Sequence, residues 1–458
     1  MRINWIIILL LLPGLSVLAQ ERENWEMLFN GKNLDGWERL NGKAPYTIEG
    51  DIVVGTTVKN TPNTFLATKK TYSDFILEYE VLADNRLNSG VQIRSNSFKA
   101  YKDGRAHGYQ VEIDPSSRSY SGGIYDEARR GWLYPLAANP KGRQAFRRGE
   151  WNRFRVEAIG NRIRTWINGT MCSNLVDAMT AEGFVALQVH SIYKDDQANT
   201  QVKWRNIRIT TENLEAVSWP ADPEVQEISY LTNELTETEK RKGYRLLWDG
   251  RSSKGWKGAK MDGFPTSGWE MKDGILTVFA TDGGESTGPG DIITTEQFGD
   301  FELELEFQIT AGANSGIKYF VDPGLNTGAG SAIGCEFQLL DDAKHPDAKK
   351  GVAGNRTLGS LYDLMTAENL SIPDRRKTFN GIGTWNKARI ISKGGKVEHW
   401  LNNEKVIEYD RFSQMFLALV NYSKYKDWPN FGRWPEGHIL LQDHGDTVHF
   451  RSIKIREF

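Results

Sequence analysis

Cysteine and histidine are scarce in this chain, and no long run of charge of one sign occurs. The 458 residues include 2 Cys and 7 His. The two cysteines, Cys172 and Cys335, are too few for a disulfide framework or a cysteine-based zinc site, so we expect two buried free thiols. Lys and Arg (57) nearly balance Asp and Glu (59), giving a formal net charge of -2. This balance argues against nucleic acid or an anionic membrane as a partner.

The chain also lacks an apolar segment long enough to span a bilayer. Residues 5–12 form a continuous apolar run behind Arg2, but this run is short for a membrane span. Val17-Leu18-Ala19 has small residues at the positions that a signal peptidase recognises. No cysteine follows that could carry a lipid. The pattern predicts a signal peptide over residues 1–19 and a mature N-terminus at Gln20. We therefore expect a periplasmic or secreted protein with no membrane span after processing.

Glycine and aromatic residues, by contrast, are abundant. The chain holds 45 Gly, 15 Trp, 16 Tyr and 20 Phe, which suit tight turns, strands and sugar-stacking surfaces. Apolar and polar residues alternate over 301–309, and a similar alternation runs over 75–81. A period of two predicts strands with one buried and one solvated face. Because helical periodicity is scarce, we expect an all-β protein built from sandwiches.

The first half of the chain returns, motif by motif and in the same order, in the second half. The matching motifs are Leu28-Phe29-Asn30-Gly31 and Leu247-Trp248-Asp249-Gly250, Asn88-Ser89-Gly90 and Asn314-Ser315-Gly316, Trp151-Asn152 and Trp385-Asn386, and Leu187-Gln188-Val189-His190 and Leu441-Gln442-Asp443-His444. The repeat predicts two homologous domains, 25–212 and 228–458.

Residues 213–227, between the two copies, are polar and aperiodic and contain Pro220 and Pro223. This composition predicts a linker that is sensitive to proteolysis. Thr236 stands three residues before Glu239, a spacing that predicts a capped short helix leading into the second domain.

The motifs resemble those of a known family. They are Leu-Phe-Asn-Gly-Lys-x-Leu-x-Gly-Trp at 28–37, Asn-Ser-Gly, Gly-Tyr-Gln-Val-Glu-Ile-Asp at 108–114, and Leu-Gln-x-His near the end of each copy. Nearly the whole mature chain is similar, twice, to the 3-keto-disaccharide hydrolases, also described as 3-keto-glucoside 1,2-lyases and 3-keto-2-hydroxyglucal hydratases. The resemblance implies two tandem concanavalin-A-like jelly-roll sandwiches and a carbohydrate substrate.

The implied chemistry sets the side chains that a site must contain. A ketone at C3 of a sugar makes the C2 proton acidic, so cleavage needs a base at C2, donors near the C3 oxygen and an acid at the leaving oxygen. No redox cofactor is required for this sequence of steps, although a divalent cation could assist.

Strand alternation selects candidates for these roles. Glu336 and Gln338 are two apart and share a face, as do Gln110 and Glu112 with acid and amide exchanged. Gln442 with His444 and Gln188 with His190 form a second pair in each copy. The candidate catalytic residues are His444, Glu336, Tyr362, His190 and Glu112. The candidate substrate-binding residues are Gln338, Gln442, Lys318, Arg94, Gln110, Gln188 and Tyr125.

Other interpretations of the same residues stay open. The polar pairs would also suit a solvated outer face, and a lone histidine is commonly structural. Asp341, Asp342 and Asp347, close to His345, would suit a cation such as calcium or an ordinary acidic loop.

Three functions are compatible with these patterns. One or both copies could be enzymes on 3-keto sugars, with the second copy, His444 and its rival Glu336 favoured for catalysis. The chain could instead be a pair of carbohydrate-binding modules, or one enzyme and one module. A conventional glycosidase is less favoured, because the Glu-x-Asp-x-x-Glu strand motif of jelly-roll glucanases does not occur. No sequence feature indicates the oligomeric state.

Overall fold

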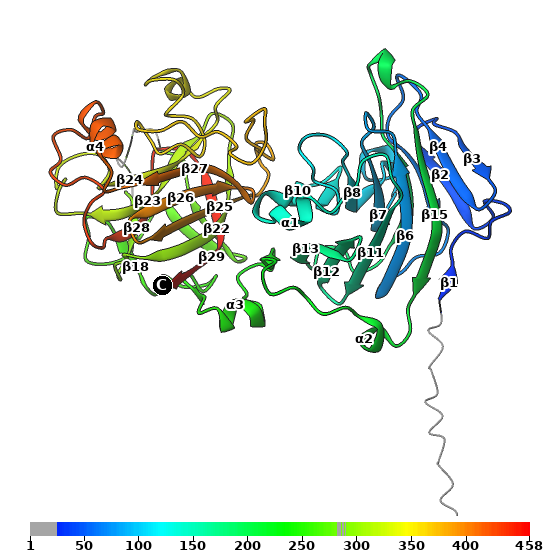
Figure 1. The fold of residues 1–458 in the computed structure, drawn as a ribbon. Coiled ribbons are helices and arrows are strands. Elements are labelled where there is room, and N and C mark those ends of the chain that lie inside the picture. The colour runs from blue at the N-terminus through cyan, green and yellow to red at the C-terminus, as the bar shows by residue number, and fades with distance from the viewer. Residues whose placement is uncertain (1–24, 282–284, 286–287, 289) are drawn as a thin grey trace, which may run out of the picture.

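The computed structural model describes residues 25–281, 285, 288 and 290–458. It consists of two β-sandwich domains joined by a segment that runs along both of them (Figure 1). The predicted signal peptide lies outside the described residues. Within the described part of the chain, no helix is long and apolar enough to cross a membrane.

The first domain packs a nine-stranded sheet against a seven-stranded sheet. The nine strands are β1 (Glu26–Met27), β3 (Tyr46–Glu49), β4 (Ile52–Thr56), β6 (Phe75–Ala83), β11 (Asn152–Ile159), β12 (Arg162–Ile167), β13 (Thr170–Val176), β15 (Gln201–Thr210) and β16 (Ile228–Ser229). The seven strands are β2 (Trp37–Asn41), β5 (Thr64–Thr68), β7 (Ser89–Asn96), β8 (His107–Ile113), β9 (Ile124–Glu127), β10 (Gly131–Tyr134) and β14 (Phe184–Val189). The short helices are η1 (Lys102–Gly104), η2 (Leu136–Ala138), α1 (Pro140–Arg143) and η3 (Asp195–Gln197).

The second domain repeats this plan with an eight-stranded and a five-stranded sheet. The eight strands are β17 (Arg245–Leu246), β19 (Trp269–Lys272), β20 (Ile275–Val278), β22 (Phe301–Ile309), β25 (Asn386–Lys393), β26 (Lys396–Leu401), β27 (Glu404–Asp410) and β29 (Val448–Glu457). The five strands are β18 (Trp256–Gly258), β21 (Ile292–Thr294), β23 (Asn314–Asp322), β24 (Ile333–Leu340) and β28 (His438–Leu441). The helices are η4 (Pro346–Lys349) and α4 (Gln414–Asn421). The prediction of two all-β sandwich domains is confirmed.

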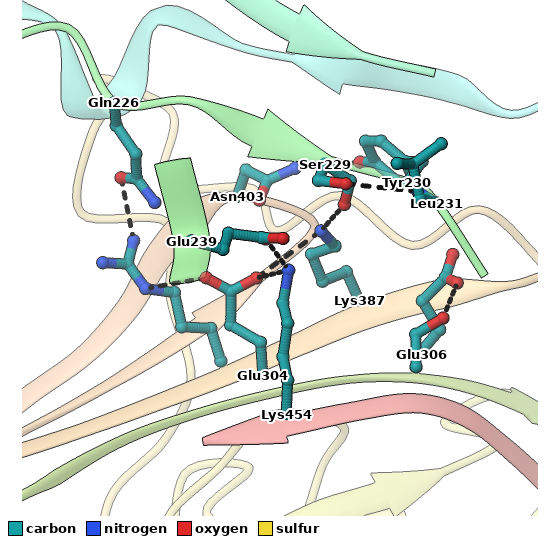
Figure 2. Close-up of polar contacts among 12 residues, drawn as sticks. Gln226, Ser229, Tyr230, Leu231, Glu239, Glu304, Glu306, Lys387, Asn403 and Lys454 are labelled. Atoms are coloured by element: carbon teal, nitrogen blue, oxygen red, sulfur yellow. Dashed lines mark hydrogen bonds and ion pairs between the residues drawn. The ribbon is translucent and has the colours of Figure 1, made fainter. Parts of the chain in front are cut away.

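The outer face of β22 is buried, although the alternation predicted a solvated face. Glu302, Glu304 and Glu306 are at most 7% exposed. Antiparallel pairing sets them opposite basic residues of β25 and β29. The connecting segment covers the face, where Gln226 and Glu239 bond Arg389 and Lys454. Glu304 lies 3.6 Å from Lys387 and 3.3 Å from Lys454 (Figure 2). Burial alone would raise the pKa of Glu304, but these cations outweigh it and hold the pKa below its usual range.

The connecting segment is anchored at its C-terminal end rather than free. Residues 211–224 are largely exposed and contain α2 (Leu214–Val217), but β16 then pairs in parallel with β13. The first sheet therefore includes Ile228 and Ser229, the first two residues of the predicted second domain. The sequence did not reveal this strand, because a two-residue parallel pair leaves no sequence signature. The capping box of Thr236 and Glu239 is confirmed and begins α3 (Glu237–Arg241).

The two domains also touch directly. The buried Tyr120 hydroxyl donates to Glu404 Oε1 at 2.8 Å, and Asn403 Nδ2 donates to the carbonyl of Leu133 at 3.1 Å. Ile372, from the second domain, packs against the core of the first. The connecting segment adds a further contact, because the Lys387 ammonium donates to the carbonyl of Ser229 at 2.6 Å (Figure 2).

This interface predicts the outcome of limited proteolysis. A glutamate-specific protease should cut after Glu212 or Glu215, which lie in the exposed stretch, and the two fragments should still co-elute in native gel filtration. The same digest should separate into two species in denaturant. Fragments that separate under native conditions would show that only the connecting segment holds the two domains together.

Candidate active sites

The seven-stranded sheet of the first domain carries a cavity of about 900 Å³ on the side turned away from the core. Side chains alternate along each strand, so Val91 and Val111 enter the core while Gln110 and Glu112 face the cavity. The sequence-predicted residues that line it are Gln110, Glu112, Tyr125, Gln188 and His190.

A row of amides runs under this cavity. Gln110 Oε1 accepts from Gln92 Nε2 at 2.6 Å and from Gln188 Nε2 at 2.7 Å, while Gln110 Nε2 donates to Glu112 Oε2 at 2.9 Å. Gln188 Oε1 is buried and has no hydrogen-bond partner among the described residues. The row therefore fixes the orientation of Glu112 and leaves one acceptor unused.

Glu112 and His190 are both shifted toward their neutral forms. Burial raises the pKa of Glu112 to about 7, and Arg118, whose guanidinium lies 3.5 Å away, offsets this only in part. Burial likewise lowers the pKa of His190. His190 Nδ1 lies 2.7 Å from the carbonyl of Ser191, which can only accept, so Nδ1 carries the proton and Nε2 is an acceptor.

Aromatic rings form one wall of the cavity, and the second domain supports that wall. Trp132 meets Tyr125 edge-on, with 5.3 Å between ring centroids, and meets Tyr120 at 5.1 Å. Tyr120 is the residue that donates to Glu404 across the interface. The position of the Trp132 wall thus depends on a contact between the domains.

The second domain places its candidate residues by the same pairing. Lys318 pairs with Glu336 and Gly316 with Gln338, as Gln92 pairs with Gln110 and Gly90 with Glu112. The exchange of acid and amide between the two copies is therefore a true structural correspondence.

The glycine of the Asn-Ser-Gly motif is required by close approach. A Cβ on Gly316 would lie 2.3 Å from Glu336 Oε1, and one on Gly90 would lie 2.5 Å from the Gln110 side chain. Only glycine lets the central polar side chain of each sheet lie flat across the neighbouring strand.

Glu336 is buried among charged groups. Its carboxylate lies 3.8 Å from Lys318 Nζ, and the Gln338 amide, turned to satisfy its neighbours, donates to it at 3.1 Å. Burial raises the pKa of Glu336, while the charges of Lys318, Lys424 and His444 act against that rise. Burial outweighs these charges, so the pKa of Glu336 stays above its usual value.

His444 and Tyr362 complete the cluster. His444 Nε2 lies 3.1 Å from the side-chain amide of Asn314. Tyr362 lies opposite Glu336, since its backbone N–H donates to the Glu336 carbonyl at 3.1 Å. Its hydroxyl donates to Asp347 Oδ2 at 2.7 Å, and burial raises the pKa of Tyr362 well above its usual value. Tyr362 is better placed as a wall than as a proton donor.

Sequence reasoning missed Lys424 and Glu285. Lys424 follows α4 in an insertion that the first copy lacks, so the repeated motifs did not indicate it. Its ammonium group lies 4.3 Å from the centroid of the Tyr362 ring. Glu285 Oε1 accepts from Gln442 Nε2 at 2.9 Å. Asn314, by contrast, stands in a repeated motif and could have been identified from it.

Arg94 does not reach the cavity. The sequence placed it on the face of Gln92, but β7 has a register shift after Ile93, and Arg94 itself has a φ of 44°. The bulge turns the guanidinium to the carbonyls of Ser73 and Gly160 and to Asp74, at 2.6, 2.7 and 2.8 Å. Arg94 is therefore a structural residue, which corrects the prediction that it binds substrate.

The acidic loop of the second domain does not converge on one point. Asp341 accepts from backbone amides such as that of Gly312, Asp342 from Leu358 N and Lys377, and Asp347 from Tyr362 and Arg356. Within the described residues, no group of three or more His, Cys, Asp or Glu side chains is arranged to hold a metal ion.

Comparison with known families now gives these sites a context. The sequence profile of the 3-keto-alpha-glucoside-1,2-lyase-like domain matches residues 24–210 and again residues 243–456. The chain belongs to this family, in two copies. The resemblance predicted from the motifs is confirmed.

Individual relatives each match about one domain. A 3-keto-disaccharide hydrolase of Bacteroides thetaiotaomicron is 36% identical over 234 residues, which cover 47% of this chain and 78% of the relative. A Parabacteroides distasonis protein named as a glycosyl hydrolase is 32% identical, with a TM-score of 0.43, and covers 50% of this chain and 100% of its own. A carbohydrate-binding module of Bacillus subtilis is 18% identical, with a TM-score of 0.28; the match covers 38% of this chain and 96% of the module.

The raised pKa of Glu112 predicts a pH-dependent stability. The folded state binds the Glu112 proton more tightly than the unfolded chain does. The contribution of Glu112 to the free energy of unfolding is therefore fully present below the unfolded pKa near 4.5, and it is lost as pH rises through about 7. The loss should reach roughly 3 kcal/mol between about pH 4 and pH 8.

Glu112→Gln should remove most of this pH-dependent loss, whatever its effect on absolute stability. The measurement is urea unfolding at the two pH values, with Glu150→Gln, at an exposed carboxylate, as control. An unchanged difference between the two pH values in Glu112→Gln would contradict the assignment.

Proposed function

We propose that this protein is an exported carbohydrate-active enzyme that cleaves 3-keto-glycosides in its second domain. Family membership supports this, as does the name of the Bacteroides relative, a 3-keto-disaccharide hydrolase. One observation carries the proposal. A buried carboxyl of raised pKa, Glu336, lies beside the ammonium group of Lys318 and within the electrostatic reach of Lys424 and His444.

The proposed elimination assigns each of these groups a step. His444 takes the C2 proton as the general base. Lys424 and Lys318 stabilise the negative charge that develops on the C3 oxygen. The electron pair then re-forms the C3 carbonyl as a C1–C2 double bond forms and the C1–O bond breaks. Glu336 gives its proton to the leaving oxygen, a role that its raised pKa supports.

Water completes the reaction by reversing these roles. It adds to C1 while C2 regains a proton, so the net result is hydrolysis without an oxocarbenium ion. Protein side chains accept and donate the protons of both steps, and the steps require neither a redox cofactor nor a divalent cation. Tyr362, whose hydroxyl is engaged by Asp347, is a wall for the sugar ring rather than an acid.

Direct displacement by two carboxylates is the alternative mechanism. It would use Glu336 and the other carboxyl of the cluster, Glu285, which lies 3.9 Å from Lys318 Nζ.

Replacing the proposed base tests the proposal. In a chain that also carries His190→Ala, to silence any activity of the first copy, His444→Ala should slow cleavage of a 3-keto-glucoside at least about a hundredfold, the lower end for losing a general acid or base. The readout is release of a chromogenic aglycone from the 3-keto-glucoside, with the unoxidised glucoside as an inert reference.

His449→Ala is the matched control, because His449 bonds Thr277 on the eight-stranded sheet, away from the site. It should retain full activity. If the variant with both His190→Ala and His444→Ala is as fast as the unmodified protein, His444 is not the base.

A further inference from the structure

We infer that the first-domain cavity is a binding site for an unoxidised saccharide, one that offers hydroxyl groups where the substrate of the second domain offers a ketone. Only the contrast with the second domain rests on the proposed function. The binding site itself rests on the donors and acceptors that line the cavity.

The cavity presents acceptors that require donors from a ligand. Gln188 is fully buried, its nitrogen is used by Gln110, and its Oε1 has no partner among the described residues. His190 Nε2 is a second acceptor, because Nδ1 holds the proton that the Ser191 carbonyl accepts. A sugar hydroxyl donates to such atoms, whereas a ketone oxygen cannot.

The cations that would hold a ketone oxygen in the second domain are replaced in the first. Gln92 stands in place of Lys318 and donates to Gln110. Lys424 lies in residues 411–437, which join β27 to β28, whereas β13 and β14 are joined by residues 177–183 alone. The short connection has no room for an equivalent of α4.

The basic residues that do line the first cavity are already engaged. Arg105 donates to Glu127 at 2.8 Å, Arg118 donates to Asp114 at 2.8 Å, and Lys102 donates to the carbonyl of Ala128 at 2.7 Å. The two arginines are paired with carboxylates and the ammonium of Lys102 is bonded to a carbonyl, so the cavity favours a neutral polyhydroxyl ligand.

The remaining lining suits the apolar faces of sugar rings. Trp132, Tyr125 and Phe65 lie in the wall, and Tyr193 stands at the rim with 76% of its surface exposed. A volume of about 900 Å³ lies within the range of small-molecule sites. An exposed tyrosine beside a polar cavity is a platform on which a ring can stack.

Calorimetric titration of the full-length chain with cellobiose and trehalose tests this inference. At least one of the two should bind. Gln188→Leu, which removes the acceptor together with the hydrogen bond to Gln110, should weaken that binding at least about fivefold. His449→Ala, at a position away from both sites, should leave it unchanged. Tyr193→Ala, at an exposed position where folding is not at risk, should weaken it severalfold.

The outcomes separate this inference from the proposed function. Binding that depends on Gln188 supports the inference even if the chain cleaves no 3-keto-glucoside. The inference is overturned if neither disaccharide binds, or if Gln188→Leu and Tyr193→Ala bind as tightly as the unmodified chain. It is also overturned if a 3-keto-glucoside binds to the first domain more tightly than its unoxidised form, with the same dependence on Gln188.

Discussion

The register of β8 on β7, and of β24 on β23, is the constraint on which both candidate sites depend. Side chains alternate along a strand, so a slip of one residue would send the polar set into the core and the apolar set to the ligand side. Gly90 and Gly316 make this register possible, because a side chain at either position would clash with Gln110 or Glu336 on the neighbouring strand. The same pairing in both domains explains why one motif recurs in two sites with different electrostatics.

Exchanging acid and amide within that fixed register gives the two domains different chemistry. Glu112 is surrounded by amides and one engaged arginine, and burial brings its pKa close to neutral. Glu336 occupies the neighbouring position, where ammonium charges oppose the effect of burial. A positive environment stabilises a developing oxyanion, and an environment rich in acceptors binds hydroxyl groups. These differences are the basis of the two roles that we propose, reaction in the second domain and recognition in the first. Glu404 connects the second domain to the Trp132 wall of the first-domain cavity through Tyr120.

The local sequence pattern was sufficient for the strands, the duplication and the polar pairs, because period-two alternation and repeated motifs are local signals. It failed where long-range partners decide the outcome. The glutamates of β22 are buried because basic residues of β25 and β29, distant in the chain, lie opposite them. Arg94 turns away at a bulge that the alternation hides, and Lys424 arrives from an insertion that the repeat does not share. These three misses concern which group meets which side chain, whereas the missed strand β16 is a two-residue parallel pair without a local signal.

The fate of the C2 hydrogen tests the central claim most directly. A 3-keto-glucoside is cleaved by the full-length protein in heavy water, and the product is analysed by NMR at early times, with free 3-keto-glucose incubated without protein to correct for spontaneous exchange. The proton that His444 takes from C2 exchanges with solvent before the glucal is hydrated, so elimination followed by hydration predicts one solvent deuterium at C2 for each molecule cleaved. A product that retains its original C2 hydrogen would contradict the account and indicate displacement at C1.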